Sequence, residues 1–295
     1  MKCKICGCDN CKIIWNDVIR DGALDHYTDQ EVILYQCNEC GVIWHDLLER
    51  DLSHYYETET YRMSLEGTVN ENDFYSMHDR ETLDKLKYTG TGIFRNKIVA
   101  DIGSGCGSFL DFIIGVASEV VAIEPSKPYR EVMKKKRFNV YPYASEAIND
   151  YECKVDVITS FDVIEHVESP EQFLSDIHNL LAQDGLAVIG TPTDAPVMRE
   201  LLGDIYEKQL LFSTQHLWIF NEKSLKMISE KVGFSSVSFK YYQRYGVSNL
   251  LGWVRDKKPK SNIVSDFTVG YLNSAWKSMC AEKGLSDYIV VYLKK

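Results

Sequence analysis

The sequence lacks any long apolar run, and it is poor in positive charge. No stretch of about 18 consecutive apolar residues occurs in the 295-residue chain, so no transmembrane helix is predicted. The first residues, MKCKICGCDN, hold no apolar segment of the kind a secretory signal needs, so a cytoplasmic location is expected. Lysine and arginine number 33 against 43 acidic residues, a formal net charge of -10. Such an acidic chain is a poor general nucleic-acid binder, so neither a nucleic-acid nor a membrane partner is expected.

Nine cysteines are present, and four of them form two matching CxxCG units. In a reducing compartment, paired CxxC spacing is typical of metal or redox sites and not of structural disulfides. Four thiolates are the tetrahedral set that Zn²⁺ prefers, and they leave no open position for catalysis. We therefore predict a structural zinc ribbon, with a redox pair or free thiols as the alternative. Cys8 or Cys11 could replace a ligand of the predicted set, which is Cys3, Cys6, Cys37 and Cys40.

The chain divides by pattern into three parts. Residues 1–45 resemble a ribbon, with strand-like IIWNDVIR and EVILYQ between its cysteine pairs, and the polar, Tyr-rich residues 46–96 read as a helical connector. From residue 97 to 295 apolar strands alternate with amphipathic helices, which predicts an α/β fold with a parallel sheet. One helix is well marked: Ser169 is its predicted N-cap, Gln172 completes a capping box, and Gly185 is its predicted stop.

Residues 99–112 read VADIGSGCGSFLDF, with glycines at alternate positions between two apolar runs. Ser108 stands where a G-x-G-x-x-G fingerprint has its last glycine, and the GK[ST] end of a P-loop is absent. The loop therefore predicts a ligand that lies close to the backbone, but it lacks the features that bind a pyrophosphate group. In open α/β sheets such a ligand lies outside the carboxyl ends of the strands.

Glu124 ends the following predicted strand, in AIEPS, where a carboxylate can accept hydrogen bonds from both hydroxyls of a ribose. A nucleoside without a pyrophosphate, beside a glycine-rich loop, suggests S-adenosylmethionine (SAM). The glycines would let the backbone approach its methionine part. Asp101 would reach the methionine ammonium directly or through water.

These residues resemble the motifs of class I SAM-dependent methyltransferases. VADIGSGCG is similar to their first motif, AIEPS to the second, SFDVIEHVESPEQFL to the fourth, and GLAVIGTPT to the strand that follows. The resemblance covers about residues 97–295. It implies a Rossmann-like seven-stranded sheet whose last strand, DYIVVYLKK, is antiparallel, and adenine contacts near Ala144. The SAM-binding residues expected on this basis are Asp101, Gly103, Ser104, Gly105, Gly107, Glu124, Pro125, Ser145, Phe161 and Asp162.

Methylation of a hydroxyl requires a base that removes its proton. Amino-group methyltransferases of nucleobases usually carry [DN]PP[YF] after the fourth strand, where this chain has Ser-Phe-Asp-Val at 160–163. That difference argues against base N-methylation. His166, just past the predicted fourth strand, and His216, in QHLWIF, are the candidate catalytic bases because both are expected at the ligand-bearing edge.

The N-terminal YQCNECGVIW and LSHYYETETY resemble bacterial methyltransferases that modify sugars, including sugar C-methyltransferases with Tyr-x-Glu-His at the acceptor site. The matching stretch here is Ser213-Thr-Gln215-His216, which keeps only the histidine and favours O-methylation. A second stretch, YYQRYGVSN, resembles methyltransferases of surface-polysaccharide pathways, and Arg244 could clamp an anionic group there. Residues 260–284 are expected to form an inserted helix, as an acceptor lid. The candidate substrate-binding residues are Gln215, Gln243, Arg244, Tyr245 and Asn249.

The sequence thus predicts a SAM-dependent methyltransferase that acts on a small polar acceptor. The favoured reaction is O-methylation of a nucleotide-activated or phosphorylated sugar-like compound in surface-glycan biosynthesis. A sugar C-methyltransferase, an RNA or protein methyltransferase, and a non-catalytic SAM-binding module stay as alternatives. The oligomeric state is left open.

Overall fold

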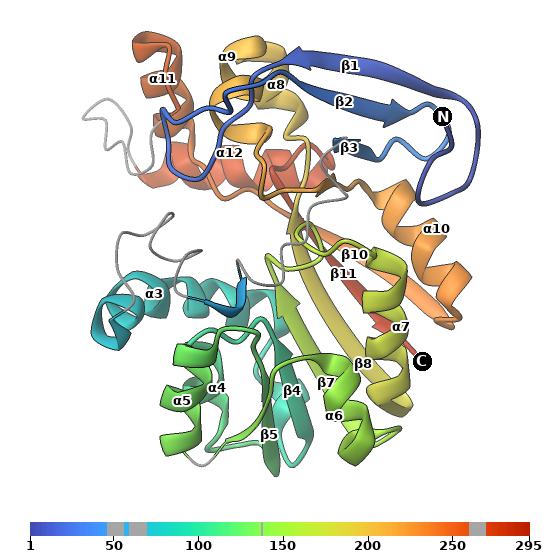
Figure 1. Ribbon diagram of the computed structural model, residues 1–295. Coiled ribbons are helices and arrows are strands. Elements are labelled where there is room, and N and C mark those ends of the chain that lie inside the picture. Colours follow the sequence, from blue (N-terminus) through green and yellow to red (C-terminus); the bar gives the residue numbers. More distant parts are fainter. Residues whose placement is uncertain (46–55, 59–69, 137, 260–269) are drawn as a thin grey trace. The chain divides into compact units, whose positions relative to one another are not determined.

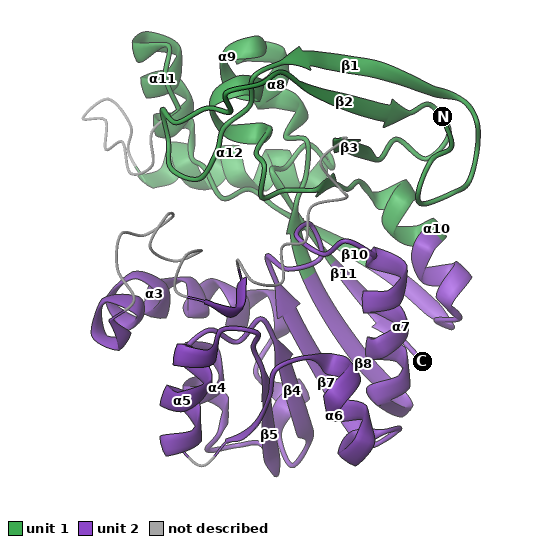
Figure 2. Cartoon of the chain, viewed as in Figure 1, with its two compact units in different colours: residues 1–49, 190–227, 239–290 green, residues 50–189, 228–238, 291–295 purple. Residues whose placement is uncertain are grey.

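The computed structural model describes residues 1–45, 56–58, 70–136, 138–259 and 270–295 (Figure 1). The chain forms two compact units that do not follow chain order (Figure 2). Unit 1 comprises residues 1–49, 190–227 and 239–290, and unit 2 comprises residues 50–189, 228–238 and 291–295. Within the described residues, no helix is long and apolar enough to cross a membrane.

A seven-stranded sheet has the order β10-β11-β8-β7-β4-β5-β6. Neighbours β4 with β5, β4 with β7, and β5 with β6 pair in parallel. At one end of the β8–β11 pair the Thr193 N–H donates to Asp287 O, and at the other the Lys295 N–H donates to Gly185 O, so β11 is antiparallel. This confirms the predicted direction of the last strand. The strands are β4 (Ile98–Ile102), β5 (Glu119–Ile123), β6 (Asn139–Tyr141), β7 (Val155–Phe161), β8 (Leu181–Pro192), β10 (Ser236–Tyr242) and β11 (Tyr288–Lys294).

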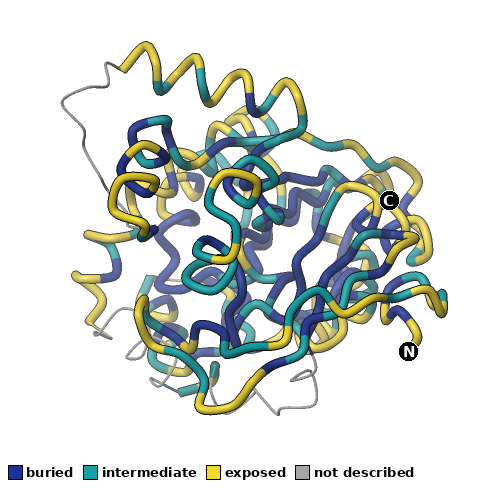
Figure 3. The backbone as a smooth tube through the Cα atoms, turned by 90° about the horizontal axis from the view of Figure 1, so that it is seen from above, coloured by how far each residue is buried: buried dark blue, intermediate teal, exposed yellow. Residues whose placement is uncertain are grey.

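The central strands form because their apolar residues are buried almost continuously (dark blue in Figure 3). Parallel strands covered on both faces need such unbroken apolar runs. In unit 2 the core around β4 and β5 is formed by Phe94, Val99, Phe109, Leu110, Ile113, Val120, Ala122, Met133, Phe138 and Val157. The helices of this part are α3 (Glu71–Thr89), α4 (Ser108–Ile113), α5 (Lys127–Lys135), α6 (Ala144–Tyr151) and α7 (Pro170–Leu180), with a short 3-10 helix at Gly92–Phe94.

Helix α7 begins as predicted and ends earlier than predicted. The Ser169 hydroxyl accepts a hydrogen bond from the Gln172 N–H, and Pro170 opens the helix. The Gln172 side chain donates to Asp176, so it does not return to the cap. The predicted stop at Gly185 is wrong, because β8 begins at Leu181. The carbonyls of Asn179 and Leu180 accept hydrogen bonds from the N–H groups of residues 153 and 154, which ends the helix there.

Unit 1 contains a four-stranded sheet of order β1-β2-β3-β9. The two strand-like stretches form a hairpin, in which β1 (Cys11–Asp17) pairs antiparallel with β2 (Val32–Cys37). Next come β3 (Ile43–His45) and β9 (Trp218–Ile219), and β9 lies outside the expected ribbon of residues 1–45. The apolar faces of this sheet share one core with later helices, through residues such as Val32, Ile43, Met198, Phe212 and Trp253.

The remaining helices are α8 (Pro196–Leu202), α9 (Asp204–Tyr206), the π-helix Glu207–Leu211, α10 (Glu222–Val232), α11 (Val247–Asp256) and α12 (Gly270–Glu282). Helix α3 lies within residues 46–96 and α12 lies within residues 260–284; the division into a connector and a separate domain stays a prediction. Residues 46–55, 59–69 and 260–269 of those predictions lie outside the described residues.

Candidate functional site

The glycine-rich loop follows β4 and is held against the end of β5. The N–H groups of Gly103 and Ser104 both donate to the Ile123 carbonyl, at 2.8 and 3.3 Å. The three glycines have φ angles of +79°, +55° and +83°, which L side chains rarely adopt. The loop conformation itself therefore requires glycine at 103, 105 and 107.

Side chains of the chain itself also lie against these glycines. A Cβ at Gly105 would lie 2.4 Å from the Phe74 ring, and one at Gly103 would lie 2.3 Å from Val163. At Gly107 the neighbours are Phe138 and Met133. From the sequence, a closely bound ligand was expected to explain the missing side chains. Internal packing and positive φ already account for them, so the glycines alone do not identify a ligand.

Glu124 follows β5 and is buried beside the loop. Its Oε2 accepts a hydrogen bond from the Gly105 N–H at 2.8 Å, and its Oε1 accepts one from the Ser126 N–H at 2.9 Å. These two backbone donors fix the orientation of a carboxylate whose oxygens each have more than one acceptor position. The backbone thus aims both oxygens, and the arrangement suits a vicinal diol.

Asp101 lies in β4 and is 3% exposed. The Thr159 hydroxyl of β7 donates to its Oδ1 at 2.6 Å. Burial raises the pKa of Asp101 to about 6, although the positive charge of Lys85 and the Thr159 hydrogen bond lower it. A carboxylate held in this way is suited to an ammonium ligand, which would repay part of the desolvation cost.

The other predicted SAM-binding residues lie at or after the carboxyl ends of β5, β6 and β7. Phe161, the last residue of β7, is buried, with Phe109 and Tyr88 around its ring and the Lys85 ammonium 5.5 Å from its centre. Asp162 is exposed and has φ +57°. Ser145 is exposed in the first turn of α6. The carbonyls of Glu124 and Pro125 accept hydrogen bonds from Arg130.

Helix α3 contributes residues that the sequence pattern did not reveal. Phe74 packs over the glycine loop, and its ring contacts those of Tyr129 and His78. The helix is anchored to α4, because the Ser108 hydroxyl donates to Asp79 at 2.6 Å and lies 2.9 Å from the Thr82 hydroxyl. The Tyr75 hydroxyl also donates to the Cys106 carbonyl. The only sequence signal was the helical i,i+4 spacing of Phe74 and His78. That spacing does not indicate what this face of the helix packs against.

His166 lies in unit 2, five residues after the end of β7. Its Nδ1 is within hydrogen-bond distance of the Tyr56 hydroxyl, at 3.2 Å, and its Nε2 is 3.9 Å from Glu165 Oε1. The side chains of His166 and Glu165 are 12% and 2% exposed. This imidazole can therefore engage a hydroxyl in a sheltered, partly acidic environment.

His216 and Gln215 belong to unit 1, between the π-helix and β9. Their segment is hydrogen-bonded to residues 20 and 21. The Thr214 N–H donates to Arg20 O, and the Thr214 hydroxyl donates to Asp21. Gln215 is buried, and its N–H donates to the Ser213 hydroxyl. The predicted roles of His216 and Gln215 stay predictions.

The stretch after β10 gathers around Asp287, which is 1% exposed. The N–H groups of Arg244 and Tyr245 donate to its carboxylate, as does Gln243 Nε2. Burial raises the pKa of Asp287, and Arg244 opposes that shift. The Arg244 guanidinium also lies 4.7 Å from the centre of the Tyr288 ring. Gln243 thus serves an internal network, Asn249 caps the Gly246 N–H, and the Arg244 side chain stays 35% exposed.

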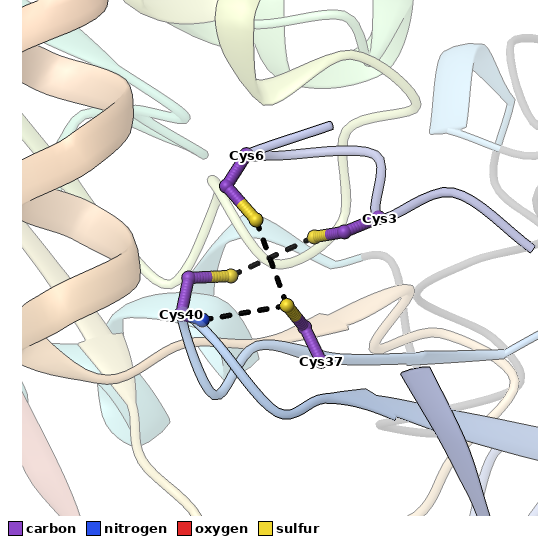
Figure 4. Close-up of side chains that lie close together, drawn as sticks. All are labelled: Cys3, Cys6, Cys37 and Cys40. Carbon is purple, nitrogen blue, oxygen red and sulfur yellow. Dashed lines mark hydrogen bonds between the residues drawn. The ribbon is translucent and has the colours of Figure 1, made fainter. Parts of the chain in front are cut away.

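Four cysteine sulfurs from the two CxxCG units lie within 4.8 Å of one another (Figure 4). Cys3 Sγ lies 3.6 Å from Cys40 Sγ, and Cys6 Sγ lies 3.5 Å from Cys37 Sγ. A tetrahedral zinc with bonds of about 2.3 Å sets its sulfurs about 3.8 Å apart, so this set fits the ion. The two turns match: the N–H of each following glycine donates to the first cysteine's carbonyl, and these glycines have φ of +74° and +75°.

Residues 69–238 match the family described as "Methyltransferase domain". A SAM-dependent methyltransferase from Archaeoglobus fulgidus has a TM-score of 0.51 at 16% identity, covering 76% of this chain and 97% of that one. One from Thermotoga maritima has a TM-score of 0.51 at 20% identity, covering 78% and 96%. At these identities the two structures support the fold alone.

Two curated proteins named "Ubiquinone biosynthesis O-methyltransferase" are also similar. The one from Glaesserella parasuis is 28% identical over 163 residues, which is 50% of this chain and 68% of that protein. The one from Pelagibacter ubique is 30% identical over 102 residues, which is 33% of this chain and 42% of that protein.

Proposed function

The chain belongs to the methyltransferase-domain family and is a SAM-dependent methyltransferase; from this premise we propose that it transfers the methyl group to a hydroxyl of a small polar acceptor. The O-methyltransferase relatives support an oxygen nucleophile. Glu124 would bind the ribose hydroxyls, and Asp101 the methionine ammonium. Zinc would be held by the four cysteines as a structural ion that takes no part in the reaction.

The observation that carries the proposal is the contact of His166 with a hydroxyl at 3.2 Å. Bound SAM would supply the methyl group, whose carbon–sulfur bond would break with its electron pair left on sulfur as the acceptor oxygen bonds the methyl carbon. His166 would take the hydroxyl proton, and Glu165 would stabilise the resulting imidazolium. An acceptor hydroxyl would have to replace the Tyr56 hydroxyl at Nδ1 to give up its proton there.

For the acceptor we propose a nucleotide-activated or phosphorylated sugar-like compound. The support is the similarity of YQCNECGVIW and LSHYYETETY to sugar methyltransferases and of YYQRYGVSN to surface-polysaccharide methyltransferases, together with a partly exposed Arg244 that suits a phosphate. A panel of nucleotide-linked sugars, phosphorylated sugars and a phenol, incubated with methyl-labelled SAM, tests this class. Methylation of the phenol alone would contradict the sugar assignment, and a product methylated on carbon would contradict O-methylation.

We expect His166→Gln to lower kcat by about 100-fold or more, the usual contribution of a general base, and to leave the Kd for SAM unchanged. The measurement is kcat with the accepted substrate, together with calorimetric titration of SAM. His216→Gln is made in parallel, because loss of turnover in that variant alone would assign the base to His216. His178→Gln, in α7 against Phe234, is the matched control. Full turnover in both His166→Gln and His216→Gln would contradict histidine base catalysis.

The affinity for SAM should fall below pH 6. The raised pKa of Asp101, about 6, means that this carboxyl is protonated in acid and loses its attraction for the SAM ammonium. Between pH 7 and pH 5 the Kd should rise about tenfold, because binding must displace the proton. Calorimetric titration across this range is the measurement. Asp101→Asn should bind weakly with a flat profile, and a wild-type Kd that does not change with pH would argue against the ammonium contact.

A further inference from the structure

The N-terminal segment contains a third CxxC motif, Cys8-Asp-Asn-Cys11, that the four-cysteine centre does not use. Its sulfurs gather with Cys37, and all three lie within 4.8 Å of one another. Cys8 Sγ is 3.2 Å from Cys37 Sγ, which is closer than Cys6 Sγ at 3.5 Å. Six cysteines from three CxxC motifs therefore form two sulfur groups that share one member.

Backbone contacts hold this third motif in place. Cys11 opens β1 and lies directly opposite Cys37 of β2 in the antiparallel register. The Asn38 N–H donates to Asn10 O at 2.9 Å, and the Asn38 amide donates to the Asn10 side chain at 2.7 Å. The Cys3 N–H donates to Cys8 O at 2.8 Å. The loop is thus tied to both cysteine turns, so its thiols need little rearrangement to bind one ion.

The grouping separates two interpretations of the extra cysteines. If Cys8 replaced Cys6 in a single centre, its sulfur would have to lie among those of Cys3, Cys37 and Cys40. The sulfurs instead fall into a set of four and a set of three. Thiolates are ligands for soft d¹⁰ cations. A thiolate sulfur also has lone pairs for more than one ion, so Cys37 can serve both sets.

We propose that Cys8, Cys11 and Cys37 form a second site for a thiophilic divalent cation such as Zn²⁺ or Cd²⁺, with Cys37 bridging to the first ion. The inference rests on the proposed zinc centre, because that centre supplies Cys37. Metal binding would displace the thiol protons of Cys8 and Cys11 into solvent. Six thiolates and two divalent cations carry the same net charge as four thiolates and one cation. Cys8 and Cys11 are partly exposed, so solvent would complete the coordination.

The test is a titration of the reduced, metal-free, full-length protein with Cd²⁺, followed by the ultraviolet absorption of the cadmium–thiolate bond. The wild type should bind two equivalents. Cys8→Ser/Cys11→Ser should bind one, with the affinity of the first equivalent unchanged. Cys153→Ser removes an exposed cysteine outside both groups and should still bind two.

Other outcomes distinguish failure of the second site from failure of the four-cysteine zinc centre on which it depends. If the wild type and the Cys8→Ser/Cys11→Ser variant both bind one equivalent with equal affinity, the second site is absent and the four-cysteine centre stands. If the double variant weakens the single equivalent, Cys8 and Cys11 ligate the first ion, which overturns the second site. If the wild type binds no cadmium, both proposals fail.

Discussion

Glu124→Gln should weaken the binding of both SAM and S-adenosylhomocysteine by about 100-fold or more. Each hydrogen bond from a ribose hydroxyl to an ionised carboxylate contributes roughly 1.5–3 kcal/mol, so losing two charged contacts gives at least this factor. Glutamine at position 124 also cannot accept both of the backbone hydrogen bonds that Glu124 accepts. Both carboxylate oxygens accept a backbone N–H, from Gly105 and from Ser126, and an amide offers one oxygen and one NH₂. One N–H would then face another donor, which disturbs the glycine loop.

Calorimetric titration of both ligands measures this effect. Glu131→Gln is the matched control, because Glu131 is an exposed glutamate of the adjacent helix α5, paired with Lys134, and its loss should leave the Kd unchanged. A thermal melt of each variant without ligand separates an altered contact from an unfolded protein. If Glu124→Gln were folded and bound SAM as tightly as Glu131→Gln, the ribose assignment would be wrong.

The fold could be predicted from the sequence because its central strands β4, β5 and β7 are mostly apolar and almost continuously buried. The run before Gly103 and the run before Glu124 became β4 and β5, and β5 is parallel to β4 as expected. The N-cap of α7 depends on residues close in sequence, Ser169 to Gln172, so the first residue of the helix was predictable. Its last residue was set by hydrogen bonds from residues 153 and 154, a long-range contact that a helical pattern does not encode.

The site was less predictable, for a related reason. Asp101 and Glu124 follow strands, and strand ends meet at one edge, so their positions follow from topology. Phe74 and Tyr56 come from the segment before the sheet, and no periodicity indicates which loop they contact. The same limit applied to the glycines: Gly105 signalled a close neighbour, but sequence alone does not tell a ligand from the Phe74 ring. Strand β9 joins the N-terminal sheet from residues 218–219, which no local pattern could show.

Cys40→Ser should lower the stability of the protein by several kcal/mol and remove bound zinc. Cys40 is fully buried; its sulfur lies 3.6 Å from that of Cys3, and its N–H donates to Cys37 Sγ. A structural zinc contributes its binding free energy directly to folding, about 10–16 kcal/mol in isolated zinc-finger peptides. The loss should be smaller here, because the sheet also packs against the core that contains Met198 and Trp253. Thermal unfolding and metal content of the purified protein are the two measurements.

Chelation and a control variant make this test specific. A strong chelator should lower the Tm of the wild type toward that of Cys40→Ser and leave the variant unchanged, because both treatments remove the same ion. Cys153→Ser should match the wild type in Tm and zinc. Every residue proposed to bind SAM belongs to unit 2, so Cys40→Ser should still bind SAM below its unfolding temperature. A Cys40→Ser protein with a full equivalent of zinc and the wild-type Tm would contradict a structural zinc at these four cysteines.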